Sequence, residues 1–238
     1  MDTKTAIITG ASSGIGSAIA RHLYKLGYHV GLIARDEQKL KLFKHALLAE
    51  SETELREPPI ILVADVCDEI AIQQAIDNFI EATGKLTVLV NNAGTLKQGT
   101  TELASRDFQQ LMNTNVLGVF HCIRAAAPYF KKQKSGYIFN IASTAGKLGF
   151  ANLGGYSASK HAVVGLGQSV MKELIHHGVK VTTLCPNLIA TEMTKEVTHL
   201  SREKMIPVID IAQTIEFLLS LSPYTTVPEI NLDCSVLI

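Results

Sequence analysis

The stretch TGASSGIG, residues 9–16, places three glycines between a short apolar run, AIIT at 6–9, and a segment with helical periodicity. Gly10 permits a sharp turn, Gly14 lets a pyrophosphate approach the backbone, and Gly16 lets helix and strand pack closely. The helix start would offer free N–H groups and a positive dipole end to phosphates. The turn therefore predicts nucleotide binding, with a plain strand–helix turn as the alternative. No Lys follows the glycines, as a phosphate-loop NTPase would require.

Five further runs rich in β-branched and apolar residues follow this one along the chain. Nearly continuous apolar runs are expected for strands buried on both faces of a parallel sheet. The runs are HVGLIA (29–34), IILVA (60–64), TVLV (87–90), GYIFNIA (136–142) and VKVTTL (179–184).

Helical patterns lie between the runs. Asp36 and Asp68 stand where helices would begin, and Gly27 and Gly84 where they would end. Strand–helix alternation over the whole length predicts an α/β fold, a doubly wound parallel sheet of about seven strands with helices on both faces. Two apolar stripes at helical spacing support this, formed by Ile15, Ile19, Leu23 and Leu26 and by Ile70, Ile72, Ile76 and Ile80.

The chain is expected to form one domain over residues 1–238, because no repeat, low-complexity segment or linker divides it. One region, from Pro186 to Pro207, is irregular for about twenty residues after the sixth strand. Long loops inside compact domains are uncommon and often functional. Residues 187–207 are therefore a candidate lid over a binding site.

The composition is that of an ordinary globular protein, with 47% hydrophobic and 18% charged residues. Lys+Arg and Asp+Glu both total 22, and this zero net charge argues against nucleic acid or an anionic membrane as partner. No apolar stretch approaches the roughly 20 residues that cross a bilayer. We expect a soluble cytoplasmic protein whose four cysteines are reduced and mostly buried, because no paired spacing joins Cys67, Cys122, Cys185 and Cys234.

The end of the second strand indicates which dinucleotide is bound. An acidic residue about 20 positions beyond the glycine turn would hold a ribose 2′-hydroxyl, but the count from Gly14 reaches Ala34, and Arg35 follows. A guanidinium suits a 2′-phosphate, and such a charge-assisted bond is worth roughly 1.5–3 kcal/mol. Asp36 could instead select NAD, although helix capping explains it equally well. We expect NADP(H) to be favoured over NAD(H).

At this point the chain resembles the short-chain dehydrogenase/reductase superfamily over nearly its whole length. The resemblance implies a single-domain, Rossmann-type enzyme that moves a hydride between NAD(P) and a carbonyl or alcohol. It is carried by motifs in the order and spacing of the family, TGASSGIG (9–16), Asp65-Val66, NNAG (91–94), Asn115 in NTNVLG, Ser143 in IAST, and Tyr156 and Lys160 in YSASK.

The resemblance also implies a catalytic tetrad of Asn115, Ser143, Tyr156 and Lys160. Tyr156 would donate the proton, and lowering its pKa from about 10 to near neutrality requires about three units, roughly 4 kcal/mol. Lys160, one helical turn away, would favour the phenolate, Ser143 would hydrogen-bond the substrate oxygen, and Asn115 in the family helps organise a water. Each residue alone has a structural alternative, such as a surface pair, a turn residue or a buried amide.

The cofactor contacts implied by the resemblance extend over the whole chain, and no metal is expected. Asp65 could also cap the following helix. Where the family usually has Pro-Gly, this chain has Pro186-Asn187, and Asn tolerates left-handed backbone angles, so the turn can survive. The expected contacts are Gly10, Ser12, Ser13, Gly14, Ile15, Gly16, Arg35, Asp65, Val66, Asn92, Ala93, Gly94, Tyr156, Lys160, Ile189 and Thr191.

The expected substrate is a small neutral carbonyl or alcohol, such as an aldehyde, a ketone or a 3-oxoacyl compound, in a mostly apolar pocket. We also expect a homodimer or homotetramer, joined through the helices that hold Asn115 and Tyr156. The alternative function is a catalytically silent NADP-binding redox sensor, which would be expected to lose Tyr156 or Lys160. The expected pocket walls supply Leu96, Leu148, Phe150, Leu153, Leu188 and Met193, with Lys97 and Lys147 nearby.

Overall fold

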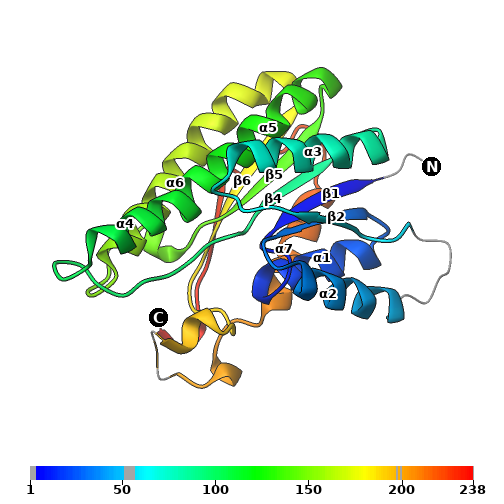
Figure 1. The fold of residues 1–238 in the computed structure, drawn as a ribbon. Coiled ribbons are helices and arrows are strands. Elements are labelled where there is room, and N and C mark those ends of the chain that lie inside the picture. The colour runs from blue at the N-terminus through cyan, green and yellow to red at the C-terminus, as the bar shows by residue number, and fades with distance from the viewer. Residues whose placement is uncertain (1–3, 51–56, 197, 199, 238) are drawn as a thin grey trace.

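A computed structural model of the 238-residue chain describes residues 4–50, 57–196, 198 and 200–237. Its centre is a parallel sheet of seven strands in the order β3-β2-β1-β4-β5-β6-β7, with helices on both faces (Figure 1). The predicted doubly wound fold is therefore confirmed. The strands are β1 Thr5–Thr9, β2 His29–Ala34, β3 Ile60–Val63, β4 Val88–Asn91, β5 Gly136–Ile141, β6 Val179–Pro186 and β7 Glu229–Leu232.

Two hydrophobic cores, one on each face of the sheet, join it to its helices. Helices α1 (Gly14–Lys25), α2 (Glu37–Ala49) and α7 (Val208–Ser220) cover one face. The other face is covered by α3 (Glu69–Thr83), α5 (Gly118–Gln133) and α6 (Gly154–Leu174). Helix α4 (Ser105–Met112) continues through a π-helix (Asn113–Leu117) into α5. Short 3₁₀ turns lie at Thr144–Gly146, Ile175–His177, Met193–Glu196, Arg202–Lys204 and Ser235–Leu237.

The predicted helix starts are correct. The Asp36 carboxylate accepts a hydrogen bond from the Lys39 N–H at 3.0 Å, and the Asp68 carboxylate accepts one from Ala71. Gly84 ends α3 with a φ of 77°, a left-handed angle that favours glycine. The apolar stripe of α3 is wrong at its start, because Ile70 is 70% exposed. Ile70 precedes the buried Ile72 by two residues, which is about 200° around a helix.

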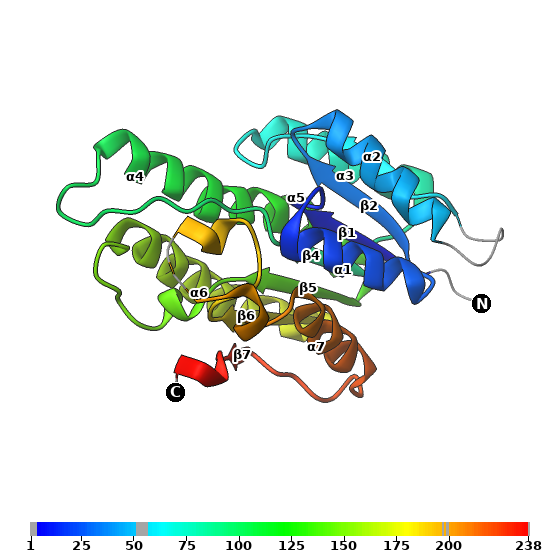
Figure 2. The same ribbon diagram turned by 90° about the horizontal axis from the view of Figure 1, so that it is seen from below.

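All six predicted strand runs form strands, but the sequence did not locate the seventh. Strand β7 has the sequence EINL and pairs with β6 alone among the described strands, so it lies at the edge of the sheet. Its two polar residues mask the apolar pattern that marks buried strands. The described residues of 187–207, in gold and orange, lie beyond the carboxyl ends of β6 and β7 (Figures 1 and 2).

The described residues contain no helix that is long and apolar enough to cross a membrane. They also contain no cluster of His, Cys, Asp and Glu able to hold a metal ion. The four cysteines are free thiols, three of them buried and Cys67 exposed, as expected from their spacing.

Candidate active site

The glycine turn after β1 has the geometry of an anion site. Gly10 and Gly14 have φ of 64° and 53°, which side chains rarely adopt. A Cβ on Gly16 would lie 2.3 Å from the Gly10 carbonyl oxygen, so Gly16 serves packing below the turn. Ser13 begins α1 without a side-chain capping bond, and no acidic residue stands in the first turn. The N–H groups and dipole of α1 are therefore available to a phosphate, which fits a dinucleotide.

The end of β4 holds this turn in place. The Thr9 hydroxyl oxygen accepts hydrogen bonds from the backbone N–H groups of Asn92 and Ala93, at 2.9 and 3.0 Å. The Asn92 side chain in turn donates to the Thr9 carbonyl at 2.9 Å. Strand β1 lies between β2 and β4, where the strand order reverses, and open α/β sheets bind ligands at such a point.

A cleft of about 450 Å³ opens at this edge of the sheet. Every predicted site residue lines it except Gly16 and Asn115. Further lining residues were not named as contacts from the sequence, although Thr114, Ile141 and Ala142 stand inside the quoted motifs and Asn187, Glu192 and Thr194 inside the predicted lid. These are Ala34, Lys39, Ala64, Thr95, Thr114, Ile141, Ala142, Pro186, Asn187, Glu192 and Thr194, and Asp36 also lines the cleft.

Basic side chains gather at the end of the cleft next to β2. Arg35 is 75% exposed, and its Nη1 lies 3.6 Å from an Asp65 carboxylate oxygen. The Asp36 carboxylate caps α2, and the N–H of Lys39 lowers its pKa. Asp65 accepts a hydrogen bond from the Cys67 N–H and does not cap α3, a role that Asp68 has. Arg35 and Lys39 are therefore the cations that line this end.

Tyr156 and Lys160 lie side by side on α6 and are both buried, 9% and 6% exposed. The Lys160 Nζ donates to the Ile141 carbonyl at 2.8 Å and lies 5.7 Å from the centre of the Tyr156 ring. Burial raises the pKa of Tyr156 to about 12, against the lowering effect of a hydrogen bond with Ser143. Burial also lowers the pKa of Lys160 to about 8. The expected lowering of the phenol pKa toward neutrality does not arise from these side chains alone, because burial outweighs the hydrogen bond with Ser143.

Ser143 and Asn115 occupy different places in the site. Ser143 follows β5, faces the cleft, and its hydroxyl oxygen accepts from the Ala145 N–H at 3.1 Å. Asn115 lies behind the wall, in the π-helix, and is 1% exposed. Its side chain exchanges two hydrogen bonds with the Thr95 backbone, at 2.8 and 2.9 Å, and donates to the Ser159 hydroxyl. Asn115 thereby joins the loop after β4 to α6.

The segment after β6 forms the opposite wall. Asn187 is not among the described residues with positive φ, so the turn needs no left-handed residue and tolerates the replacement of glycine. The Asn187 N–H donates to the Leu232 carbonyl at 2.8 Å, which ties the turn to β7. Beyond it, Ile189 and Thr191 line the cleft. A Cβ on Gly14 would lie 3.5 Å from the Thr191 methyl group, so this wall meets the glycine turn.

Six of the eight residues expected to surround a substrate divide into three groups. Leu96 and Leu153 pack against the cluster that contains Tyr156. Leu148, Phe150 and Met193 are 64%, 40% and 40% exposed, and Met193 lines the cleft. Lys147 points elsewhere, because its ammonium donates to the Glu229 carboxylate of β7 at 2.9 Å.

Comparisons with known proteins agree with this geometry. The family model described as short chain dehydrogenase matches residues 4–201. The chain is 32% identical to the 3-oxoacyl-(acyl-carrier-protein) reductase FabG of Staphylococcus aureus, over 92% of this chain and 91% of the relative. It is 35% identical to the NADPH-dependent pterin aldehyde reductase of Arabidopsis thaliana, over 80% and 76%. The solved structure of ElxO with NADP bound has a TM-score of 0.88 at 32% identity and 99% coverage of both chains.

The chain therefore belongs to the short-chain dehydrogenase family and is an oxidoreductase.

Proposed function

We propose that this enzyme transfers a hydride between NADP(H) and a small carbonyl or alcohol substrate, with Tyr156 as the acid and base. The observation that supports it is the meeting of Tyr156, Lys160 and Ser143 in the cleft that also contains the glycine turn. A bound nicotinamide would supply the hydride. The chain's own residues must then supply a proton, orient the substrate oxygen and exclude water.

The protonation states favour carbonyl reduction. With a pKa of about 12, Tyr156 is fully protonated at neutral pH and holds its proton ready for donation. The carbonyl carbon gains the hydride, its oxygen gains the phenolic proton, and a tyrosinate remains to be reprotonated. Ser143 can donate a hydrogen bond to the same oxygen, and Lys160 stabilises the tyrosinate when its ammonium is charged. Asn115 would hold the Thr95 loop against α6 and help organise a water beside Lys160.

NADP(H) is the cofactor we propose, in preference to NAD(H). The cleft has Arg35 and Lys39 at the end of β2, where a ribose 2′-phosphate would lie. Asp36, the alternative that would select NAD, has a carboxylate engaged by the Lys39 N–H. The NADPH-dependent relative and the NADP-bound structure support the same choice.

The substrate class proposed is a neutral aldehyde, ketone or 3-oxoacyl compound. The apolar side chain of Met193 lines the cleft and is 40% exposed, which suits such compounds better than strongly anionic ones. The names of the two relatives, an oxoacyl reductase and an aldehyde reductase, fall in this class. Residues 187–207 would act as the lid within one domain spanning residues 1–238.

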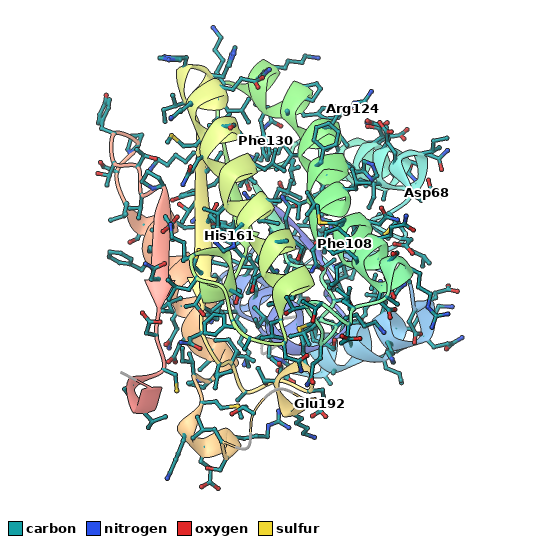
Figure 3. All side chains as sticks on the ribbon, turned by 90° about the vertical axis from the view of Figure 1, so that its left-hand side faces the viewer. Asp68, Phe108, Arg124, Phe130, His161 and Glu192 are labelled. Carbon is teal, nitrogen blue, oxygen red and sulfur yellow. The ribbon has the colours of Figure 1, made fainter. Side chains whose placement is uncertain are left out.

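A homodimer or homotetramer is part of the proposal, as is a cytoplasmic location. Phe108, Leu117 and Phe120, on α4, the π-helix and α5, are each more than 40% exposed. Phe108 lies beside α6, on the side of the molecule that Figure 3 turns to the viewer. Large apolar side chains exposed together support a subunit contact on these helices.

The test is a binding and turnover experiment with NADPH. Fluorescence of NADPH on mixing reports binding, and its oxidation with a panel of aldehydes, ketones and 3-oxoacyl thioesters reports turnover. Tyr156→Phe should bind NADPH but lose turnover by 10²-fold or more. Tyr224→Phe, at a 98% exposed position, is the matched control and should behave as the wild type. Binding without turnover over the whole panel would favour the redox sensor instead.

A further inference from the structure

The wall of the cleft opposite the glycine turn is held from outside by one arginine. Residues Ile189, Thr191, Glu192 and Thr194 line the cleft on this side. Figure 3 shows Glu192 at the bottom of the view, beside the short turns of the segment after β6. From the solvent side, Arg202 donates from Nη2 to the Ala190 carbonyl at 3.0 Å and from Nη1 to the Glu192 carboxylate at 2.9 Å.

The backbone next to Arg202 is held in place by contacts of the neighbouring residues. It opens the 3₁₀ turn Arg202–Lys204, and the next residue, Met205, is only 6% exposed. The Cys234 thiol donates to the Lys204 carbonyl at 3.1 Å. Ile206 then pairs with Ile189, with the Ala190 N–H donating to the Ile206 carbonyl at 2.9 Å. The guanidinium therefore joins two chain segments about ten residues apart at a fixed spacing.

The two bonds of Arg202 do not have equal weight. Glu192 is 75% exposed and also pairs with Lys195, so the ion pair is screened by solvent and contributes little. The bond to the Ala190 carbonyl acts on the backbone directly beside Ile189 and Thr191. Because Thr191 meets Gly14 across the cleft, a shift of this backbone changes the width available to a bound pyrophosphate and nicotinamide.

We propose that Arg202 is a positioning residue that fixes the backbone of 189–192 and thereby sets how tightly the cleft holds NADP(H). The inference rests on the proposed cofactor. It makes Arg202 act through the wall, with no contact to the cofactor itself. A purely electrostatic explanation, in which Arg202 attracts the anionic cofactor from a distance, makes different predictions for its neighbours.

Three variants separate the two explanations. Arg202→Ala removes both bonds and one positive charge. Lys204→Ala removes the same charge from the same turn but leaves both Arg202 bonds in place. Glu192→Gln removes the ion pair, keeps the carbonyl bond and takes a negative charge out of the wall.

The first measurement is the Kd for NADPH by fluorescence titration, at low salt and at 0.5 M NaCl. We expect Arg202→Ala to raise the Kd about fivefold at both salt concentrations, because a backbone contact is not screened. Lys204→Ala should leave the Kd unchanged, and Glu192→Gln should lower it, because it takes a negative charge out of the wall that faces the anionic cofactor. Equal losses in Arg202→Ala and Lys204→Ala that vanish at high salt would overturn the proposal in favour of distant charge.

The second measurement, hydrogen exchange of the protein without cofactor, does not depend on the proposed function. Arg202→Ala should speed amide exchange in 189–194 at least several-fold and leave exchange in β1 and α6 unchanged. Unchanged amide exchange in 189–194 would refute the proposal that Arg202 fixes this backbone, even if the protein binds NADPH. If the wild type binds neither NADPH nor NADH but exchange is faster in the variant, the role of Arg202 in fixing the backbone stands and the proposed cofactor is wrong.

Discussion

Replacing Lys160 with Met should stabilise the protein while it destroys activity. Lys160 is buried, and burial lowers its pKa from 10.5 to about 8. A difference of 2.5 pKa units corresponds to about 3 kcal/mol of penalty on the charged form at pH 7. Met has a similar length and no charge, but it leaves the Ile141 carbonyl without the Lys160 donor, which costs about 1 kcal/mol. We expect Lys160→Met to gain about 2 kcal/mol in free energy of unfolding at pH 7.

The gain should depend on pH with a definite sign. Below pH 8 both folded and unfolded states carry the charge, so the wild type bears the full penalty. As the pH rises from about 8 to about 10.5, the folded state releases its proton first and the penalty disappears. At pH 9.5 about 1.5 kcal/mol of penalty remains, so the gain should fall to about 0.5 kcal/mol once the lost hydrogen bond is counted.

Urea unfolding at pH 7 and pH 9.5, without cofactor, measures this gain. Lys172→Met, at an exposed position of the same helix, is the control and should show no change with pH beyond a few tenths of a kcal/mol. The prediction is wrong if Lys160→Met is less stable than the wild type at pH 7, or if its gain in free energy of unfolding grows as the pH rises. Either result would mean that the buried charge of Lys160 does not destabilise the folded state.

Three further predictions address the cofactor, the packing and the assembly. Arg35→Asp should reduce the preference for NADPH over NADH at least tenfold in initial rates, and an unchanged preference would contradict the cofactor assignment. Gly165→Ala should raise the stability by about 0.5–1 kcal/mol, because nothing lies within 4 Å of its Cβ. Gly167→Ala should lower it by about 1–3 kcal/mol, because its Cβ would lie 2.3 Å from the Thr183 hydroxyl, and equal effects in thermal melts would count against this packing. Phe120→Asp should give a smaller species by light scattering if α5 forms the subunit contact, whereas an unchanged mass would exclude that face.

Features that depend on a few neighbouring residues were predictable. The caps at Asp36 and Asp68, the left-handed Gly84 and the first six strands all follow from local preferences, and the structure has them. Strand β7 escaped prediction because its pairing with β6, more than forty residues away, makes a polar segment a strand. Motif spacing and the predicted lid likewise covered most of the cleft lining but did not indicate Lys39, which reaches the cleft through the orientation of the start of α2.

By itself, the sequence determined the first six strands and their order along the chain, the glycine turn and the pair Tyr156 and Lys160 one helical turn apart. Such features depend on backbone preferences and periodicity within short segments. Only the tertiary structure decided the charge states of these two residues. Burial raises the pKa of Tyr156 and lowers that of Lys160, and the spacing of residues in a sequence does not show which side chains become buried. It alone brought Arg202 to the Ala190 carbonyl and turned Lys147 toward Glu229, since contacts between distant segments arise when the helices and loops pack on the sheet.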